Sequence, residues 1–354
     1  MKIAILGSAH PLRGGLASYN ERLATQFVRE GDEVKLYSFS LQYPDFLFPG
    51  KTQFTDQPPP PDIQIDSCVN SINPLNWWIT GNKIKQTRPD LLIVKFWLPF
   101  MAPCLGTICK IVKSNGHTRV VAIIDNIIPH EKRPGDTLLA RYFCRQVDAF
   151  ITMSQSVKCD LKAFTNNQPV QYIPHPLFDH FGRPVSKEAA CEKLHLNPKD
   201  KYILFFGFIR DYKGLDILLD AMADEKVRSL GIKLIIAGEF YEDSAPYLQN
   251  LETLQLHNSV ILKTDYIPDD EVRFFFSAAD LVVQPYKHAT QSGVTQICYH
   301  FEKPMLVTRV GGLPEMVPHQ VAGYVAEPNA KEIAGFIQLF FSLNNSDAFK
   351  EGIR

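Results

Sequence analysis

Short β-branched segments alternate with longer amphipathic segments along this chain, and the alternation occurs twice. The apolar segments of the first half are KIAILG, EVKLYSF, DLLIVKF, RVVAIID and AFITMS. Those of the second half are KYILFFGF, IKLIIAG, VILKT, DLVVQPY and KPMLVTR. Such alternation is typical of parallel β-sheets covered by helices. The sequence therefore predicts an α/β fold with two doubly wound, Rossmann-like domains.

The alternation pauses between Pro174 and Lys201, where the segment contains four prolines. We therefore expect an N-terminal domain over residues 1–175, a linker over 176–200 and a C-terminal domain over 201–354. Residues 41–80, with a run of four prolines from Pro58, predict a long surface excursion. Ligands of open parallel sheets bind at the carboxyl ends of the strands. We expect the two domains to face each other across a cleft, with binding loops at these strand ends.

Composition and charge exclude several classes of protein. A formal net charge of -1 over 354 residues gives no general attraction to nucleic acid or anionic lipid. No apolar stretch reaches the roughly 20 residues that a membrane-spanning helix needs, and the N-terminus lacks the pattern of a secretory signal. The seven cysteines are odd in number and lack zinc-site spacing. We expect reduced thiols in a cytoplasmic protein that can still touch a membrane surface.

Two cations follow the first apolar segment of the second half, in FFGFIRDYKGLDILLDAM. The strand is expected to end at Gly207, and Arg210 and Lys213 lie just before a helix. A helix N-terminus disfavours positive charge unless an anion is present. An arginine fork with a lysine suits a diphosphate. The alternative is a solvated pair, or salt bridges to Asp211 or Asp216.

A polar segment without acids separates the strand-like DLVVQPY from a helical run that ends near Pro304. Its centre contains the residues Gln291, Ser292, Gly293 and Val294. Free amides at a helix N-terminus, with hydroxyls beside them, form a nest for an anion, and a carboxylate there would repel a phosphate. The alternative is an ordinary helix cap by Ser292.

The first half contains two further candidate loops. Gly14 and Gly15 precede a helix, where they permit close approach of a ligand to backbone amides. Neither a dinucleotide fingerprint nor a phosphate-binding P-loop pattern occurs there, and a plain tight turn is the alternative. Asp125 ends another strand and His130 follows it, so these side chains could orient a substrate or transfer a proton. A lone histidine is more often structural.

Taken together, these motifs resemble the retaining, nucleotide-sugar-dependent glycosyltransferases of family 4, which have the GT-B fold. The resemblance covers nearly the whole chain. It is most specific in FFGFIRDYKGLDILLDAM, LIIAGEF, DYIPDDEVRFFFSAADLVVQPY, KPMLVTRVGGLPEMV and AGYVAEP, and HPLRGGLASYNERLA fits the family's glycine loop.

The resemblance implies a role for individual residues. Arg210 and Lys213 match the basic pair that holds the donor diphosphate, and Gly14 and Gly15 match the loop beside phosphates and acceptor. The segment with Tyr266 and Ile267 matches the contact to the nucleotide base, and the matching nucleotide-side loops contain Gly207 and Gly238. The implied donor is a nucleoside-diphosphate sugar, the implied acceptor is a saccharide or a lipid-linked group, and neither a metal nor another cofactor is implied.

The sequence departs from the family in two places. Many members have two glutamates, E-x7-E, across the segment that here reads ATQSGVTQI. Gln296 lies near the place of the second glutamate, where we expect it to contact the ribose or the sugar. At the strand end where many members have a histidine, this chain has Asp125. A front-face retaining mechanism tolerates both differences, since the leaving diphosphate can accept the proton of the acceptor.

The expected function is therefore a retaining hexosyltransferase in cell-envelope or exopolysaccharide synthesis. One alternative is another enzyme of the same fold, either an epimerase or a phosphorylase-like enzyme. The other is a non-catalytic subunit that binds nucleotide sugars, and the missing glutamates favour this second alternative. Family members usually continue beyond the helix that ends near Arg354, so the end of the chain is expected to be shortened. Two aromatic segments, Trp77-Trp78 and Phe96–Phe100, could touch a membrane, although core packing is the favoured interpretation.

Overall fold

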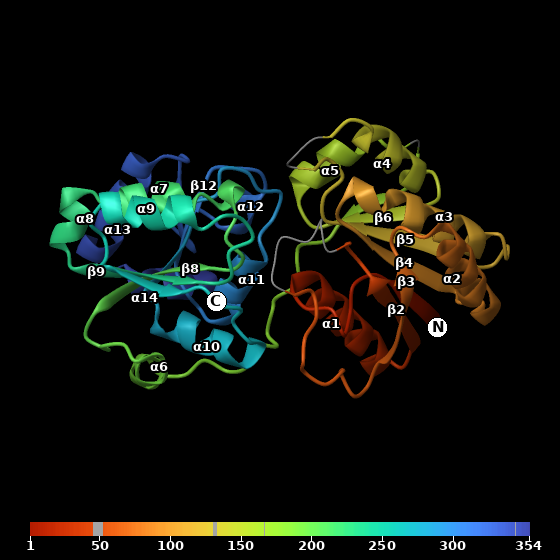
Figure 1. Ribbon diagram of the computed structural model, residues 1–354, viewed down its shortest axis with the longest axis horizontal. Coiled ribbons are helices and arrows are strands. Elements are labelled where there is room, and N and C mark those ends of the chain that lie inside the picture. The colour runs from red at the N-terminus through yellow and green to blue at the C-terminus, as the bar shows by residue number, and fades with distance from the viewer. Residues whose placement is uncertain (45–51, 130–132, 166, 344) are drawn as a thin grey trace. The chain divides into compact units, whose positions relative to one another are not determined.

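The chain forms two compact units, Met1–Pro174 and His175–Arg354, in a computed structural model (Figure 1). The structure describes residues 1–44, 52–129, 133–165, 167–343 and 345–354. Within these residues, no helix has the length and apolar character that a membrane span requires. All seven cysteines are among the described residues and have free thiols.

The first unit is built on a seven-stranded parallel sheet with the order β3-β2-β1-β4-β5-β6-β7. Its strands are β1 (Lys2–Leu6), β2 (Glu33–Leu41), β3 (Gln64–Asn70), β4 (Leu91–Phe96), β5 (Arg119–Ile124), β6 (Ala149–Thr152) and β7 (Val170–Tyr172). Its helices are α1 (Gly15–Arg29), α2 (Pro74–Thr87), α3 (Ala102–Lys113), α4 (Asp136–Cys144) and α5 (Gln155–Leu161), with a 3₁₀ turn, η2 (Pro99–Met101).

The second unit has a six-stranded parallel sheet with the order β10-β9-β8-β11-β12-β13. Its strands are β8 (Lys201–Phe206), β9 (Ile232–Ala237), β10 (Val260–Lys263), β11 (Leu281–Gln284), β12 (Met305–Thr308) and β13 (Gly323–Ala326). Its helical elements are α6 (Lys187–Leu194), η3 (Asp211–Lys213), α7 (Leu215–Met222), α8 (Glu225–Ser229), α9 (Ala245–Thr253), α10 (Asp269–Ala278), α11 (Gly293–His300), α12 (Leu313–Met316), α13 (Ala330–Leu343) and α14 (Ser346–Ile353).

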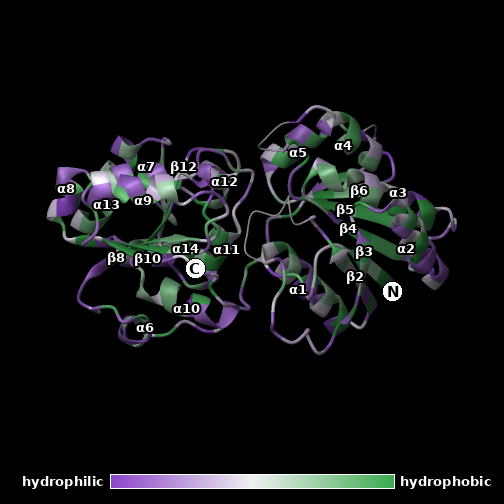
Figure 2. Ribbon diagram, viewed as in Figure 1, coloured by the Kyte–Doolittle hydropathy of each residue, from purple (hydrophilic) through white to green (hydrophobic). Residues whose placement is uncertain are grey.

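The strands are apolar because helices cover both faces of each sheet. Figure 2 shows the strands as mostly hydrophobic and the helices as mixed. Leu92, Val94, Ile203 and Leu204 are fully buried. The predicted α/β fold with two doubly wound sheets is confirmed. That the two domains face each other across a cleft stays a prediction.

Each sheet reverses its strand order beside its first strand. β1 lies between β2 and β4, and β8 lies between β9 and β11. The connections on the two sides of that strand leave in opposite directions, so the carboxyl end of the strand opens into a crevice where ligands of doubly wound sheets bind. The loops that follow β1, β4, β8 and β11 are therefore the ones that position a site.

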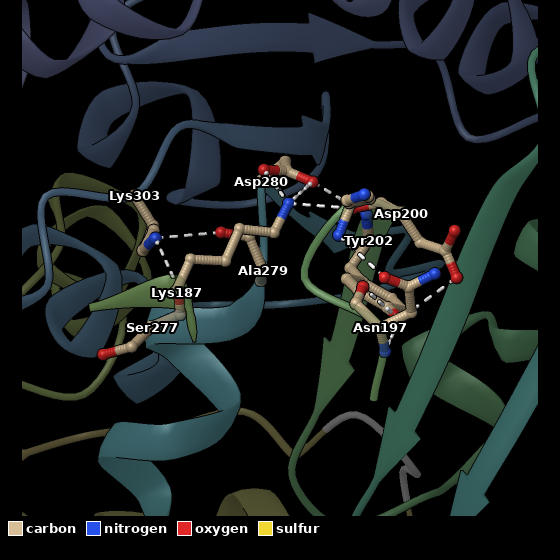
Figure 3. A network of polar contacts seen from close by, with 9 residues as sticks. Lys187, Asn197, Asp200, Tyr202, Ser277, Ala279, Asp280 and Lys303 are labelled. Carbon is tan, nitrogen blue, oxygen red and sulfur yellow. Dashed lines mark hydrogen bonds and ion pairs between the residues drawn. The ribbon is translucent and has the colours of Figure 1, made fainter. Parts of the chain in front are cut away.

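Residues 176–200, which we predicted to be a linker, lie within the second unit and contain α6. Figure 3 shows how this segment is held. Lys187 donates to both carboxylate oxygens of Asp280, each at 2.8 Å, and Asp280 also accepts the backbone N–H of Tyr202 at 2.8 Å. α6 thus forms part of the packed domain. The predicted excursion over 41–80 also contains regular structure, because β3 and the first half of α2 fall within it.

Candidate functional site

Two glycine loops touch each other at the carboxyl edge of the second sheet. Gly207 follows β8 with φ +100°, and Gly238 follows β9 with φ +138°. A Cβ atom on Gly238 would lie 2.3 Å from the carbonyl oxygen of Gly207, so no side chain fits there. The Gly207 N–H donates to the Ala237 carbonyl at 2.9 Å. Two lengths of backbone, half-buried at Gly207 and buried at Gly238, are thereby brought together at the predicted nucleotide side.

Lys213 points back toward the first of these loops. Its Nζ atom lies 3.0 Å from the position that a Cβ atom would take on Gly207. Burial and the charge of Arg210 lower the pKa of Lys213 from its usual 10.5 to about 8. Arg210 lies over the ring of Tyr241 at 5.4 Å, and Lys213 over the ring of Tyr286 at 5.7 Å. Two cations are thus held near each other by aromatic rings.

Neither Arg210 nor Lys213 forms an ion pair with an acid in the part of the chain that the structure describes. The nearby acids pair with another lysine instead, since the Nζ atom of Lys287 lies 2.6 Å from Asp211 and 2.9 Å from Asp216. The alternative of salt bridges from Arg210 or Lys213 to these aspartates is therefore wrong. Two close cations without an acid favour an anionic ligand.

The first turn of α11 lies beside the same lysine. The Cγ2 atom of Val294 is 3.8 Å from the Cβ position on Gly207, which Lys213 also approaches. Ser292 is the N-cap residue, but its side chain accepts no hydrogen bond from the helix. Its hydroxyl instead lies 3.4 Å from that of Tyr286. The alternative of a Ser292 cap is therefore wrong, and the first-turn amides keep the anion-binding potential of a helix N-terminus.

Glutamines occupy the polar positions around this turn. Gln296 is buried within α11, and Gln291 is half-buried just before it. Gln284, at the end of β11, was missed by the sequence reasoning. Its Oε1 atom accepts from the Thr295 hydroxyl at 3.3 Å, and its buried Nε2 has no partner among the described residues. The sequence feature that could have identified Gln284 is its position as the one polar residue at the end of the apolar strand LVVQ.

Tyr266 and Ile267, predicted to contact a base, line a pocket of about 260 Å³. The pocket also involves Lys193 at the end of α6, Lys263 at the end of β10 and Phe274 on α10. In the sheet order, β9 separates β10 from β8 and its Lys213 loop. Aromatic and polar groups together are typical of small-molecule pockets.

In the first unit, Gly14 is the N-cap residue of α1, with φ 99° and no side-chain cap on the helix. A Cβ atom added to Gly15 would meet no atom within 4 Å. The first turn of α1 therefore offers amides beside open space, as the predicted glycine loop requires. No acid lies in that turn.

Asp125 follows β5 and binds a buried lysine that the sequence reasoning missed. Its Oδ1 atom is 2.7 Å from the Nζ atom of Lys95, which is only 2% exposed. The same Nζ lies 3.5 Å from the ring centre of Tyr19. Burial lowers the pKa of Lys95, and Asp125 opposes that shift. The available signal was one lysine in the apolar strand LLIVKF. His130, the other residue predicted here, lies outside the described residues.

Among the residues that the structure describes, no group of three or more histidine, cysteine, aspartate or glutamate side chains is placed to hold a metal ion. The structure thus brings only some of the predicted residues together, while Tyr266 and Ile267 line a separate pocket and Asp125 pairs with Lys95. Gly207, Gly238, Lys213 and Val294 meet in the second unit, while Gly14 and Gly15 begin α1 in the first.

Two family models match the chain. Residues 13–177 match the glycosyltransferase family 4 model, and residues 200–341 match the model described as glycosyl transferases group 1. One relative, D-inositol 3-phosphate glycosyltransferase from Segniliparus rotundus, is 30% identical over 47% of this chain and 37% of its own length. An uncharacterized glycosyltransferase of Methanocaldococcus jannaschii is 25% identical over 94% of this chain and 87% of its own length. The chain thus spans little more than a third of the first relative.

Solved structures show the same fold. Sucrose-phosphate synthase from Thermosynechococcus elongatus superposes with a TM-score of 0.75 at 15% identity, covering 99% of this chain and 93% of that one. Anabaena HepE in complex with UDP superposes with a TM-score of 0.72 at 17% identity, covering 100% of this chain and 93% of that one. At such low identity these likenesses show the fold alone.

Proposed function

Because this chain belongs to the GT-B glycosyltransferases of group 1 and family 4, we propose that it transfers a sugar from a nucleoside-diphosphate sugar with retention of anomeric configuration. The proposed acceptor is a saccharide or a lipid-linked group, and the proposed setting is synthesis of the cell envelope or an exopolysaccharide. UDP in the HepE structure supports a nucleoside diphosphate as the leaving group.

One observation supports the proposal above all others. Arg210 and Lys213 are cations without an acidic partner among the described residues, and Lys213 lies beside the uncapped first turn of α11. Positive charge in this place opposes folding, since burial and repulsion by Arg210 lower the pKa of Lys213. A diphosphate would satisfy both cations and the helix amides together.

The proposed chemistry needs stabilisation of the leaving diphosphate. As the bond from the anomeric carbon to the phosphate oxygen breaks, negative charge grows on the diphosphate. Arg210 and Lys213 offset that charge, and Gly207 and Gly238 allow the donor to approach the backbone. In this proposed step the two cations, and not a metal, supply the positive charge.

The acceptor hydroxyl attacks the same face of the sugar that the diphosphate leaves. Its oxygen forms the new bond to the anomeric carbon, and its proton passes to a phosphate oxygen of the leaving group. No enzymatic nucleophile is required, which agrees with the absence of acids from ATQSGVTQI. Gln296 contacts the ribose or the sugar as a neutral replacement for a glutamate. Asp125, held by Lys95, and the first turn of α1 orient the acceptor.

A second candidate function is a non-catalytic subunit that binds nucleotide sugars. The specific observation in its favour is the same acid-free segment, since Gln296 lies where a family glutamate would be expected. The missing acids count against an epimerase of this fold, which uses acids in its site.

A transfer assay separates these functions. The protein is incubated with a panel of nucleotide sugars and saccharide or lipid-linked acceptors, and NMR follows the anomeric configuration of the product. We expect an axial donor to give an axial product, and Arg210→Ala or Lys213→Ala to slow transfer at least about a hundredfold. Lys226→Ala, at an exposed lysine on α8, is the control that leaves the rate unchanged. Nucleotide-sugar binding with neither transfer nor hydrolysis across the panel would favour the subunit instead.

A further inference from the structure

α2 has an exposed apolar outer face. Leu75 is 66% exposed, Trp78 60% and Ile79 51%, and Ile72, just before the helix, is 49% exposed. At about 3.6 residues per turn, Leu75, Trp78 and Ile79 share one side of the helix. Single exposed apolar side chains are ordinary, but three that cluster on one side of a helix, with a fourth just before it, indicate an interaction surface.

The inner side of α2 and its N-terminus are fixed by contacts with the rest of the first unit. Asn73 caps it by accepting from the N–H groups of Leu75 and Asn76, at 3.0 and 3.3 Å. Trp77 packs against the core and donates its indole N–H to the Asn70 carbonyl at 2.8 Å. A Cβ atom on Gly81 would lie 2.9 Å from Ile111 of α3, so the two helices pack closely. The exposed side chains therefore stand on a rigid support.

The sequence prediction of core packing is thus confirmed for Trp77 and Phe96 and is wrong for Trp78. Phe96 is fully buried, whereas Trp78 is directed away from the core. Adjacent tryptophans on a helix point about 100° apart. Trp77 packs against the core, whereas Trp78 is exposed and can contact a partner.

Charge around this face identifies the kind of partner. From Ser71 to Pro89 the chain contains Lys83, Lys85 and Arg88 and no acidic residue. Lys83 pairs with Asp66 at 2.7 Å, while Lys85 and Arg88 pair with no acid among the described residues. By helical periodicity, Lys83 and Lys85 lie on the two borders of the apolar face.

We propose that the outer face of α2, formed by Ile72, Leu75, Trp78 and Ile79, docks on the interface of an anionic lipid bilayer. A helix lying in the membrane interface places apolar and aromatic side chains below the headgroups and lysines beside them. The basic flanks attract anionic lipid over a short range. A second copy of the chain fits less well, because it would bring like charges together. This inference does not rest on the proposed sugar transfer.

Vesicle co-sedimentation tests the proposal with the full chain. Vesicles of phosphatidylcholine alone are compared with vesicles that also contain phosphatidylglycerol. We expect the protein to bind the anionic vesicles and to be released by salt. The triple variant Leu75→Ser, Trp78→Ser, Ile79→Ser should lower the partition coefficient at least about tenfold. Leu343→Ser, at a leucine that is 57% exposed on α13, is the matched control and should bind like wild type.

The thermal unfolding of the triple variant should match that of wild type, because the three side chains are exposed. Failure of the wild-type protein to bind anionic vesicles at low salt would overturn the proposal, as would unchanged binding of the folded triple variant. Sedimentation velocity supplies a further outcome. A wild-type dimer that the triple variant converts to a monomer would assign the face to self-association and overturn membrane docking.

Discussion

The ammonium group of Lys213 lies against Gly207, 3.0 Å from where a Cβ atom would stand on that glycine. The contact joins Gly207, just after β8, to Lys213 at the end of η3, six residues later in the sequence. It places the cation beside the half-buried Gly207 and beside Val294 of α11. The proposed diphosphate site depends on this arrangement.

Gly207→Ala should weaken binding of nucleoside diphosphates at least about tenfold, because the new methyl group would displace Lys213. The substitution also costs roughly 1–2 kcal/mol of stability, since φ is +100° there. Gly231→Ala separates the two effects, because Gly231 also has a positive φ, of +63°, while its added Cβ would meet no atom within 4 Å. Calorimetric titration should show normal binding for Gly231→Ala. Equal binding by both variants would contradict the assignment.

Binding should depend on pH through Lys213. Its pKa in the ligand-free protein is about 8, and a bound diphosphate would raise that pKa. Binding therefore takes up a proton near pH 8, and affinity should fall as pH rises above about 8. The free energy of unfolding of the ligand-free protein should change with pH in the opposite direction to the affinity. The unfolded chain binds more protons at this lysine between about pH 8 and 10.5, so this group makes folding more favourable as pH rises through that window.

Titrations in buffers of different ionisation enthalpy measure this proton uptake. The control is Lys213→Arg, because the arginine guanidinium stays protonated across this pH range. The part of the proton uptake that comes from Lys213 should therefore disappear in this variant. Uptake that is identical in wild type and Lys213→Arg would show that another group is responsible.

Asp125→Ala should lower the free energy of unfolding by about 3–5 kcal/mol, because it leaves the buried Lys95 ammonium without its carboxylate. Lys95→Met combined with Asp125→Ala should recover most of that loss, since no uncompensated charge remains. Urea unfolding measures both. Nucleoside diphosphate binding should be unchanged in the double variant if the donor site lies in the second unit. A double variant as unstable as Asp125→Ala would contradict this account.

Asp280→Ala should lower the free energy of unfolding by about 1–3 kcal/mol, because the Tyr202 N–H loses its acceptor and Lys187 keeps only the Asp200 carbonyl, without its carboxylate partner. Residues 176–200 should also become more sensitive to limited proteolysis, since Lys187 fixes α6. Asp347→Ala is the matched control, because it removes an ion pair from an aspartate that is 95% exposed and should cost less than about 0.5 kcal/mol. Similar losses in the two variants would show that the network does not hold the segment.

The alternation of apolar and amphipathic segments was sufficient to predict both sheets, because strands buried on two faces need continuous apolar sequence. The same rule failed over 176–200. There, α6 is held by long-range contacts, among them the ion pair of Lys187 with Asp280 and the packing of Lys193 on Phe274 of α10, and no local sequence pattern indicates such partners. Proline content alone favoured a linker.

In the site, the sequence alone singled out Arg210 and Lys213 as candidates, because positive charge at a helix start is unusual. The sequence could not show that Lys287 forms ion pairs with both Asp211 and Asp216. Those pairs depend on the packing of the loop after β11 against η3. Lys95 was missed for a related reason. One lysine in an apolar strand does not indicate a partner by itself, and the pairing with Asp125 depends on the parallel register of β4 and β5. The alternative of a Ser292 cap was suggested by local sequence alone, which could not show that the Tyr286 hydroxyl lies beside that side chain.

The central claim is that Arg210 and Lys213 hold a diphosphate, and calorimetric titration of nucleoside diphosphates tests it most directly. We expect the wild-type protein to bind at least one nucleoside diphosphate. Arg210→Ala and Lys213→Ala should each weaken that binding by about ten- to a hundredfold, as loss of a charge-assisted hydrogen bond implies, whereas Lys226→Ala should bind normally. Dissociation constants that stay the same in both site variants, or that are equal for the nucleoside and its diphosphate, would contradict the claim.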